Sequence, residues 1–451
     1  MLKRYTLPPM DTLWGKTETQ FEGWLDVEIT AMRARVALGE LPERAYQAVE
    51  EFRETVTIDV ERIRALERLY GHDMIAFIEA MRELLVATGA EDAARQFHVP
   101  LTSYDIEDPA MILRLREGTV EIRKACRQLE EALVRRAKEH QWTLMIGRTH
   151  GQYAEPTTFG CLLMVFRQEV RRAIRRLTLA IELELSESKM SGAVGAYGDI
   201  GPELERLTLG YLDLKPAAAE TQILQRDRHA SLLATYAVTA GVIEHMCRVF
   251  WEFMRSEIRE LEEPRTEKQR GSSAMPWKKN PILTERLQGM ARLVRGYAIP
   301  ALENIATPDW RDISQSSVER HIFPDATAVL YYMAMKAAEL VDGLVVRKEE
   351  MLETLNARSC GVWAGQRIRD ALVESGVEPN AAYEYVQRTS FRAVASRLHL
   401  SLEMRQAHIS ETDWRTAERA IGAERLQQLF DPMAYIKSGV EHIFREGEDS
   451  P

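Results

Sequence analysis

The sequence predicts an all-α protein, and three observations support this fold class. Apolar residues recur at steps of three and four within residues 122–133, as they do on one face of an amphipathic helix. The same spacing continues for several turns within residues 163–181, which indicates a long helix. Runs that alternate apolar and polar residues between turn residues are scarce, so few strands are expected.

Further helices are predicted at residues 229–261, 282–297 and 324–346. Glycine and proline indicate the breaks, which are expected at residues 98–109, 147–156, 191–202, 264–281 and 306–324. The last hundred or so residues have shorter helical units separated by Gly376, Pro379 and Pro432. We therefore expect an N-terminal helical domain (1–106), a central long-helix bundle (107–346) and a small C-terminal helical domain (347–451).

Composition and charge exclude several classes of protein. The chain has 451 residues, with 59 basic and 69 acidic side chains and a net charge of −10, so it lacks the basic excess that non-specific binding to nucleic acid or an anionic membrane needs. The four cysteines form no CxxC pair, which argues against a disulfide framework or a zinc site and favours the cytoplasm. The longest weakly polar stretch, residues 230–243, is shorter than the roughly 18 residues of a membrane span.

The most informative segment reads GSSAMPWKKNP at residues 271–281 and is called the signature loop below. Asn280 and Pro281 suit the start of a helix. The unpaired amides of that helix start, together with Lys278 or Lys279, would receive a carboxylate. A capped helix after a polar loop explains the same residues without any activity, because a serine with no base beside it is usually a turn residue.

The signature loop resembles the GSSxMPxKxNP segment of the fumarase/aspartase superfamily. TSYD at residues 102–105 and GRTHGQYAEPTTFG at residues 147–160 resemble the two other signature regions of that superfamily, in the same order and spacing. Within it the chain is most similar to the adenylosuccinate lyase family, through segments that span nearly the whole sequence: Arg4-Tyr5, His72-Asp73, Thr221-Gln222, QRDRH at residues 225–229, and residues 311–320.

This resemblance implies a fold, an assembly and a reaction. The subunit would have the three-domain, all-α fumarase/aspartase-like fold, in a homotetramer whose active sites are each built from three subunits. It would release fumarate from adenylosuccinate, leaving AMP, and from the succinylated aminoimidazole carboxamide ribotide (SAICAR), leaving the amide (AICAR). No metal or organic cofactor is implied. The elimination needs a base for a carbon-bound proton, an acid for the departing nitrogen, and donors that hold the carboxylates.

The resemblance also implies the catalytic roles. Ser272 would be the base, on a loop that closes over a dry, positive site, and His150 would be the acid. Ser273, Lys278 and Asn280 would hold the succinyl carboxylates and stabilise the intermediate. His98 and His72 correspond to two further histidines of the family's site. Taken singly, each histidine is also explained as a polar side chain in a loop or at a helix end.

The nucleotide contacts are implied in the same way. Arg4, Tyr5, Arg311, Ser316 and Arg320 would bind the phosphate, for which the planar fork of arginine is well suited. Further substrate contacts are expected from Asp73, Thr102, Ser103 and Gln222. Thr102 and Asp105 also fit a capping box, which would explain that pair without a substrate.

Some positions depart from the superfamily pattern, namely Gly71, Pro100, Tyr153, Trp277 and Arg286. The predicted acid and base are unaffected, so elimination is better supported than the identity of the nitrogen-linked group. Two alternatives therefore stay open. One is a lyase of the same superfamily with an argininosuccinate, nitrosuccinate or carboxymuconate type of substrate, which would not need the phosphate contacts. The other is a helical-bundle binding or structural protein without turnover.

Overall fold

A computed structural model describes residues 2–268, 272–413 and 415–449 of the chain. The chain forms two compact units, each assembled from three stretches of sequence. Unit 1 comprises Met1–Gln128, Arg172–Glu244 and Leu287–Lys336, and unit 2 comprises Leu129–Arg171, His245–Arg286 and Ala337–Pro451. Helices dominate both units and the strands are short, so the predicted all-α class is confirmed.

Five long helices contribute segments to both units: α7 (Ser103–Glu139), α8 (Phe159–Leu183), α10 (Asp227–Phe253), α11 (Ile282–Glu303) and α12 (Ser314–Gly343). Within unit 1, the hydroxyls of Thr119 on α7 and Tyr236 on α10 lie 2.6 Å apart. A Cβ atom on Gly118 would lie 2.6 Å from a methyl group of Thr327, so glycine is needed for α7 to approach α12 this closely. Within unit 2, Arg135 on α7 donates to Asp342 on α12 at 2.8 Å.

Unit 1 also contains the shorter helices η1 (Lys3–Tyr5), α1 (Pro8–Trp14), α2 (Thr17–Ala37), α3 (Glu43–Thr55), α4 (Val60–Tyr70), α5 (Asp73–Ala87), α6 (Glu91–Gln96) and α9 (Pro202–Tyr211). Buried aromatic rings join α2 to α5, with the ring centroids of Phe21 and Phe77 5.8 Å apart and those of Trp24 and Phe77 5.5 Å apart. This core fixes the start of α5, where His72 and Asp73 lie, and the segment after α6 that carries His98.

In the part of the chain that the structure describes, the strands form three two-stranded sheets. In unit 2, β1 (Leu144–Thr149) pairs antiparallel with β2 (Gln152–Thr158), and β5 (Leu261–Glu262) pairs antiparallel with β6 (Val345–Val346). In unit 1, β3 (Glu187–Ser188) pairs in parallel with β4 (Lys215–Pro216). The predicted break at residues 147–156 is thus a β-hairpin. The turn residues His150 and Gly151 both have positive φ, at 54° and 74°, as a tight two-residue hairpin turn requires.

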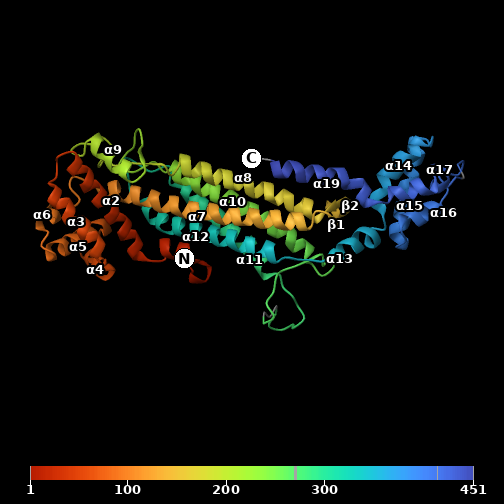
Figure 1. Ribbon diagram of the computed structural model, residues 1–451, viewed down its shortest axis with the longest axis horizontal. Helices are drawn as coiled ribbons and strands as arrows, with labels where there is room; N and C mark the ends of the chain where they lie inside the picture. Colours follow the sequence, from red (N-terminus) through yellow and green to blue (C-terminus); the bar gives the residue numbers. More distant parts are fainter. Residues whose placement is uncertain (1, 269–271, 414, 450–451) are drawn as a thin grey trace. The chain divides into compact units, whose positions relative to one another are not determined.

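The C-terminal part of unit 2 consists of short helices, as predicted: α13 (Lys348–Glu353), η2 (Thr354–Arg358), η3 (Val362–Ala364), α14 (Gly365–Glu374), α15 (Pro379–Ser396), α16 (Leu400–Gln406), α17 (Ala417–Ile421), α18 (Ala423–Leu429) and α19 (Pro432–Asp449) (Figure 1). They surround a core of their own, which includes the buried side chains of Leu355, Trp363 and Tyr385. The predicted domain limits at 106/107 and 346/347 stay a prediction.

Several predicted helix ends are wrong. Helix α10 ends at Phe253 and not at Leu261, because the chain leaves it through turns and enters β5. Pro109 and Pro324 lie inside α7 and α12, although both were expected at breaks. Packing against neighbouring helices outweighs the local cost of proline there, since the adjacent Ala110 and Phe323 are buried. In the part of the chain that the structure describes, no helix is both long and apolar enough to cross a membrane.

Candidate active site

The signature loop is described from Ser272 onward, and Gly271 lies outside the described residues. The Ser272 hydroxyl oxygen accepts hydrogen bonds from the backbone N–H groups of Ala274, at 3.3 Å, and Met275, at 3.0 Å. Residues 273–279 are exposed, whereas Ser272 is half-buried. Two N–H groups that point at one oxygen stabilise negative charge on it. An ordinary serine turn has the same two contacts, so the role of Ser272 as the base stays a prediction.

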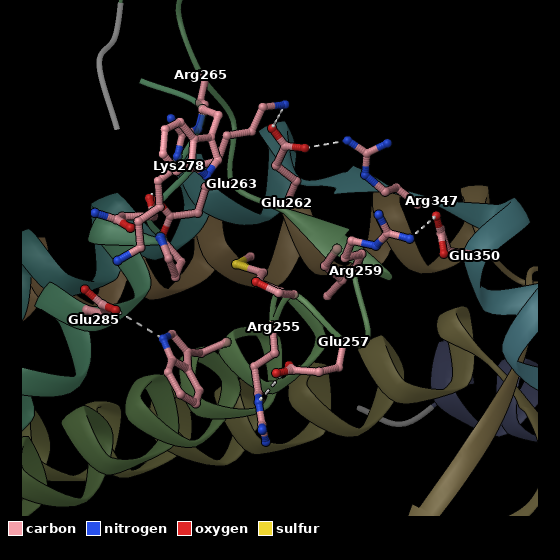
Figure 2. A pocket seen from close by; sticks show the side chains of 18 residues that line it. Arg255, Glu257, Arg259, Glu262, Glu263, Arg265, Lys278, Glu285, Arg347 and Glu350 are labelled. Atoms are coloured by element: carbon pink, nitrogen blue, oxygen red, sulfur yellow. Dashed lines mark hydrogen bonds and ion pairs between the residues drawn. The ribbon is translucent and has the colours of Figure 1, made fainter. Parts of the chain in front are cut away.

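A cavity of about 820 Å³ lies beside the loop in unit 2 and is lined by Lys278, Lys279 and Asn280 together with side chains from α10, α11 and the β5–β6 region (Figure 2). Lys279 Nζ lies 2.6 Å from one oxygen of Glu262, and Arg347 Nη2 lies 2.5 Å from the other. Burial alone would raise the pKa of Glu262, but the two cations outweigh burial and lower it. Glu262 therefore stays ionised and anchors the end of the loop.

Helix α11 begins at Ile282, as predicted. The amides of its first turn, however, are not open to a substrate carboxylate, because the carboxylate of Glu263 accepts from the N–H groups of Leu283, at 3.1 Å, and Thr284, at 2.6 Å. An internal carboxylate thus occupies the position that was expected to bind the ligand. Lys278 and Asn280 still line the cavity.

The predicted acid, His150, lies at the tip of the β1–β2 hairpin and is exposed. Below it, Arg148 on β1 is held by the fully buried Glu260, with Nη2 and Oε1 2.8 Å apart. Among the described residues the His150 ring makes no hydrogen bond and no ion pair, with Ser272 or with any other side chain. Within a single chain, the structure therefore does not join the predicted acid to the predicted base.

Several predicted nucleotide contacts come together in unit 1, where Asp73, Gln222, Arg311, Ser316 and Arg320, with Tyr104, form what we call the arginine cluster. Arg320 forms an ion pair with Asp73 and also donates to the Ser316 hydroxyl at 3.5 Å. Arg311 donates to the amide oxygen of Gln222 at 3.1 Å. His72 adjoins the cluster, with Nδ1 3.5 Å from Asp73 Oδ1.

The remaining predicted residues of unit 1 lie in three places. His98 has a left-handed backbone (φ 66°), and its Nδ1 lies 2.5 Å from a carboxylate oxygen of the fully buried Glu28. Thr102 and Ser103 lie at the start of α7, where the Asp105 carboxylate accepts from the Thr102 N–H at 2.9 Å, as in a capping box. Arg4 and Tyr5 lie in η1, and the Tyr5 ring packs against Tyr332 at 5.4 Å.

Comparison with known proteins places the chain in a family. A family model described as a lyase matches residues 6–296. The adenylosuccinate lyase of Thermotoga maritima is 40% identical over 448 residues, which cover 99% of this chain and all of that protein. The adenylosuccinate lyase of Bacillus subtilis is 40% identical over 444 residues, which cover 98% of this chain and 99% of that one. The chain belongs to the adenylosuccinate lyase family.

Solved structures agree on the fold. A fumarate lyase from Mesorhizobium sp. BNC1 superimposes with a TM-score of 0.87 at 24% identity, with complete coverage of both chains. The 3-carboxy-cis,cis-muconate lactonizing enzyme of Pseudomonas putida gives the same TM-score at 23% identity, over 98% of this chain and 97% of that one. At such identities these structures show the fold alone. The predicted family and the predicted fumarase/aspartase-like fold are therefore confirmed, while the roles of the individual site residues stay predictions.

Three side chains of this adenylosuccinate lyase family member lie at the candidate site but were not predicted from the sequence. Glu285 lines the cavity beside Lys278 and accepts from the Trp251 indole N–H at 3.2 Å. Tyr104 and Glu107 line a smaller cavity of about 190 Å³, together with Ser316 and Arg320. Tyr104 and Glu107 are three residues apart on α7 and therefore share one face of the helix. This spacing was the signal in the sequence that could have indicated both as site residues.

Glu107 has an unusual charge state. Burial, followed by the nearby Asp73, raises the pKa of its carboxyl group to about 8, although Arg320 acts in the opposite direction. Glu107 is therefore mostly neutral at pH 7. A neutral carboxyl group can lie beside a bound anion without repelling it, which an ionised one cannot do.

The structure offers no candidate metal centre in residues 2–268, 272–413 and 415–449. No group of three or more histidine, cysteine, aspartate or glutamate side chains there has the arrangement that would hold a metal ion. The four cysteines are free thiols and are all buried.

Proposed function

We propose that the chain releases fumarate from adenylosuccinate, leaving AMP, and from SAICAR, leaving AICAR. The observation that carries this proposal is the full-length match, at about 40% identity, to relatives named adenylosuccinate lyase. The arginine cluster supports it independently, because two arginines and a buried serine within one small region suit a phosphate group.

In the proposed mechanism, Ser272 acts as the base. Its ionised hydroxyl takes the proton from the carbon next to a succinyl carboxylate, and the electron pair left on that carbon is delocalised into the carboxylate. Ser273, Lys278 and Asn280 stabilise the resulting negative charge. The carbon–nitrogen bond then breaks, and His150 gives its proton to the departing nitrogen. The products are fumarate and the nucleotide with its amine restored.

We further propose that the working form is a homotetramer in the cytoplasm, with each active site assembled from three subunits. Among the described residues no hydrogen bond joins His150 to Ser272, which supports this proposal, because a second subunit would then supply one of the two. Exposed apolar side chains on α8, α10 and α11, among them Leu179, Val238 and Leu293, also support burial between subunits. Mixing inactive Ser272→Ala with inactive His150→Ala subunits should restore part of the activity.

Purified protein tests the main proposal directly. Adenylosuccinate is followed by its ultraviolet absorbance while fumarate and AMP are quantified in the same samples. We expect one fumarate and one AMP for each adenylosuccinate consumed. Fumarate from another succinyl compound, with none from adenylosuccinate, would instead favour a different substrate. If neither adenylosuccinate nor any other succinyl compound is converted, a binding role without catalysis would be favoured.

A further inference from the structure

Tyr104 is the aromatic residue at the centre of the arginine cluster. We propose that it is a positioning residue for the nucleotide phosphate, whose ring holds the Arg311 guanidinium flat while its hydroxyl borders Ser316. The inference deepens the proposed function and rests on it for the identity of the ligand, a phosphate monoester. The geometry that supports it lies within unit 1.

The Arg311 guanidinium is held by two contacts. Its central carbon lies 4.1 Å from the centroid of the Tyr104 ring, close enough for a strong cation–π contact. One terminal nitrogen donates to Gln222 at 3.1 Å. Among the described residues Arg311 makes no other hydrogen bond and no ion pair. The ring and Gln222 thus fix the plane of the guanidinium and leave its other N–H groups for a ligand.

The Tyr104 ring is itself held firmly. The side chain is buried, and its hydroxyl accepts a hydrogen bond from the Gln315 amide at 3.3 Å and interacts with the Ser316 side chain. A second guanidinium, that of the buried Arg226, lies 5.6 Å from the ring centroid. Arg226 is fixed in turn by Glu319, with Nε and Oε1 2.8 Å apart, and by Asp108.

The two arginines of the cluster are held by different means. Arg320 forms an ion pair with the Asp73 carboxylate, which balances its positive charge. A phosphate therefore has to compete with Asp73 for Arg320. Arg311 is held by a neutral ring and a neutral amide, so its charge is not cancelled by either partner. A phosphate can therefore bind Arg311 without displacing an internal carboxylate. An aromatic ring is suited to this task because it orients a cation without neutralising it.

The test replaces Tyr104 in the full-length protein by Leu, by Met and by Phe. Leu and Met remove the ring, whereas Phe keeps the ring and removes only the hydroxyl. The inhibition constants of AMP and of fumarate against adenylosuccinate turnover are measured, together with the calorimetric dissociation constant of AMP. Tyr236→Leu serves as a matched control, since Tyr236 is equally buried in unit 1 but bonds only to structural residues.

We expect Tyr104→Leu and Tyr104→Met to weaken AMP about tenfold by both measures and to raise KM, with little change in kcat and in the fumarate constant. Tyr104→Phe should stay within about threefold of the wild type for AMP. Three results would each overturn the proposal. They are equal changes in the AMP and fumarate inhibition constants, an unchanged dissociation constant for AMP in the ring-free variants, and an equal loss of AMP affinity in Tyr104→Phe and Tyr104→Leu. So would loss of the folded state in both ring-free variants, which would assign the ring to packing.

The calorimetric measurement separates this inference from the proposed function. If the wild type binds AMP but does not convert adenylosuccinate, the proposed function is wrong, and the Tyr104 series still reports on the phosphate. If the wild type converts adenylosuccinate and the Tyr104 variants bind AMP normally, the positioning role is wrong and the function stands.

Discussion

The arginine cluster of unit 1 and the signature loop of unit 2 differ in how firmly their side chains are held. In the cluster, charged side chains are already held by the protein, as Arg320 is by Asp73 and Arg311 is by Gln222 and Tyr104. In the loop, residues 273–279 are exposed, and among the described residues Ser272 makes hydrogen bonds only with amides of its own turn. A preformed cluster suits recognition of a fixed charged group, whereas an exposed loop can close and exclude water when the proton is taken.

This difference predicts that substitutions in the two regions should affect different kinetic constants. Changes in the cluster should mainly alter KM and the affinity for AMP. Changes at the proposed acid and base should mainly alter kcat. The experiments below sharpen or break this division, in order of decreasing effect.

Apart from Ser272, the largest effect is expected at His150. His150→Ala should lower kcat by about a hundredfold to ten-thousandfold, because no group is left to protonate the departing nitrogen, while AMP binding is unchanged. His442→Ala is a suitable control, since His442 is another exposed histidine of unit 2 on α19. Near-normal kcat in His150→Ala, measured by fumarate release, would remove His150 from the acid role.

Arg320→Ala comes next. It should raise KM for adenylosuccinate by roughly tenfold to a hundredfold, because a charge-assisted contact to the phosphate is lost, and kcat should change little. Arg116→Ala removes another arginine of unit 1, which pairs with the exposed Asp213, and should leave KM unchanged. Steady-state kinetics distinguish the two, and an unchanged KM in Arg320→Ala would argue against phosphate binding there.

Glu107 should make nucleotide binding depend on pH. Because its pKa is raised to about 8, it is neutral below that pH and gains a negative charge above it, next to Asp73, Asp108, Arg311 and Arg320. KM should therefore rise above pH 8, by about tenfold at pH 9 if ionised Glu107 blocks binding. Glu107→Gln should flatten this rise between pH 7 and 9. An identical pH profile in the variant would exclude Glu107 as its cause.

The smallest effect concerns stability. Glu263 is buried and caps α11 through the amides of Leu283 and Thr284. Glu263→Ala should lower the free energy of unfolding by about 1–2 kcal/mol, measured by urea denaturation. Glu267→Ala, at an exposed position on the same connection, should have almost no effect. Equal stability of the two variants would mean that the cap is not important.

Much of the fold was predictable from local patterns. The step of three and four predicted α7 and α8, because those helices bury one broad apolar face. The ends were harder, since they depend on contacts between distant residues. Pro109 and Pro324 stay inside helices because neighbouring helices hold them, and the turn after Phe253 is fixed by β5 pairing with β6.

The candidate site was predictable where motifs are contiguous in sequence. Ser272 and Lys278 came from one such run, and His150 from another. The sequence did not indicate that Glu263 would occupy the α11 amides, because a carboxylate 20 residues earlier is brought there only by the folded chain. Tyr104 was also missed, because only the folded chain brings the Arg311 guanidinium, more than 200 residues later in the sequence, to 4.1 Å from the centroid of its ring.

The most direct test of the division between the cluster and the loop is one sample of Ser272→Ala in which fumarate release and AMP affinity are both measured. We expect fumarate release to fall by about a thousandfold or more. The dissociation constant for AMP should stay within about twofold of the wild type. Retained turnover, or a loss of AMP binding in parallel with the loss of turnover, would contradict the account.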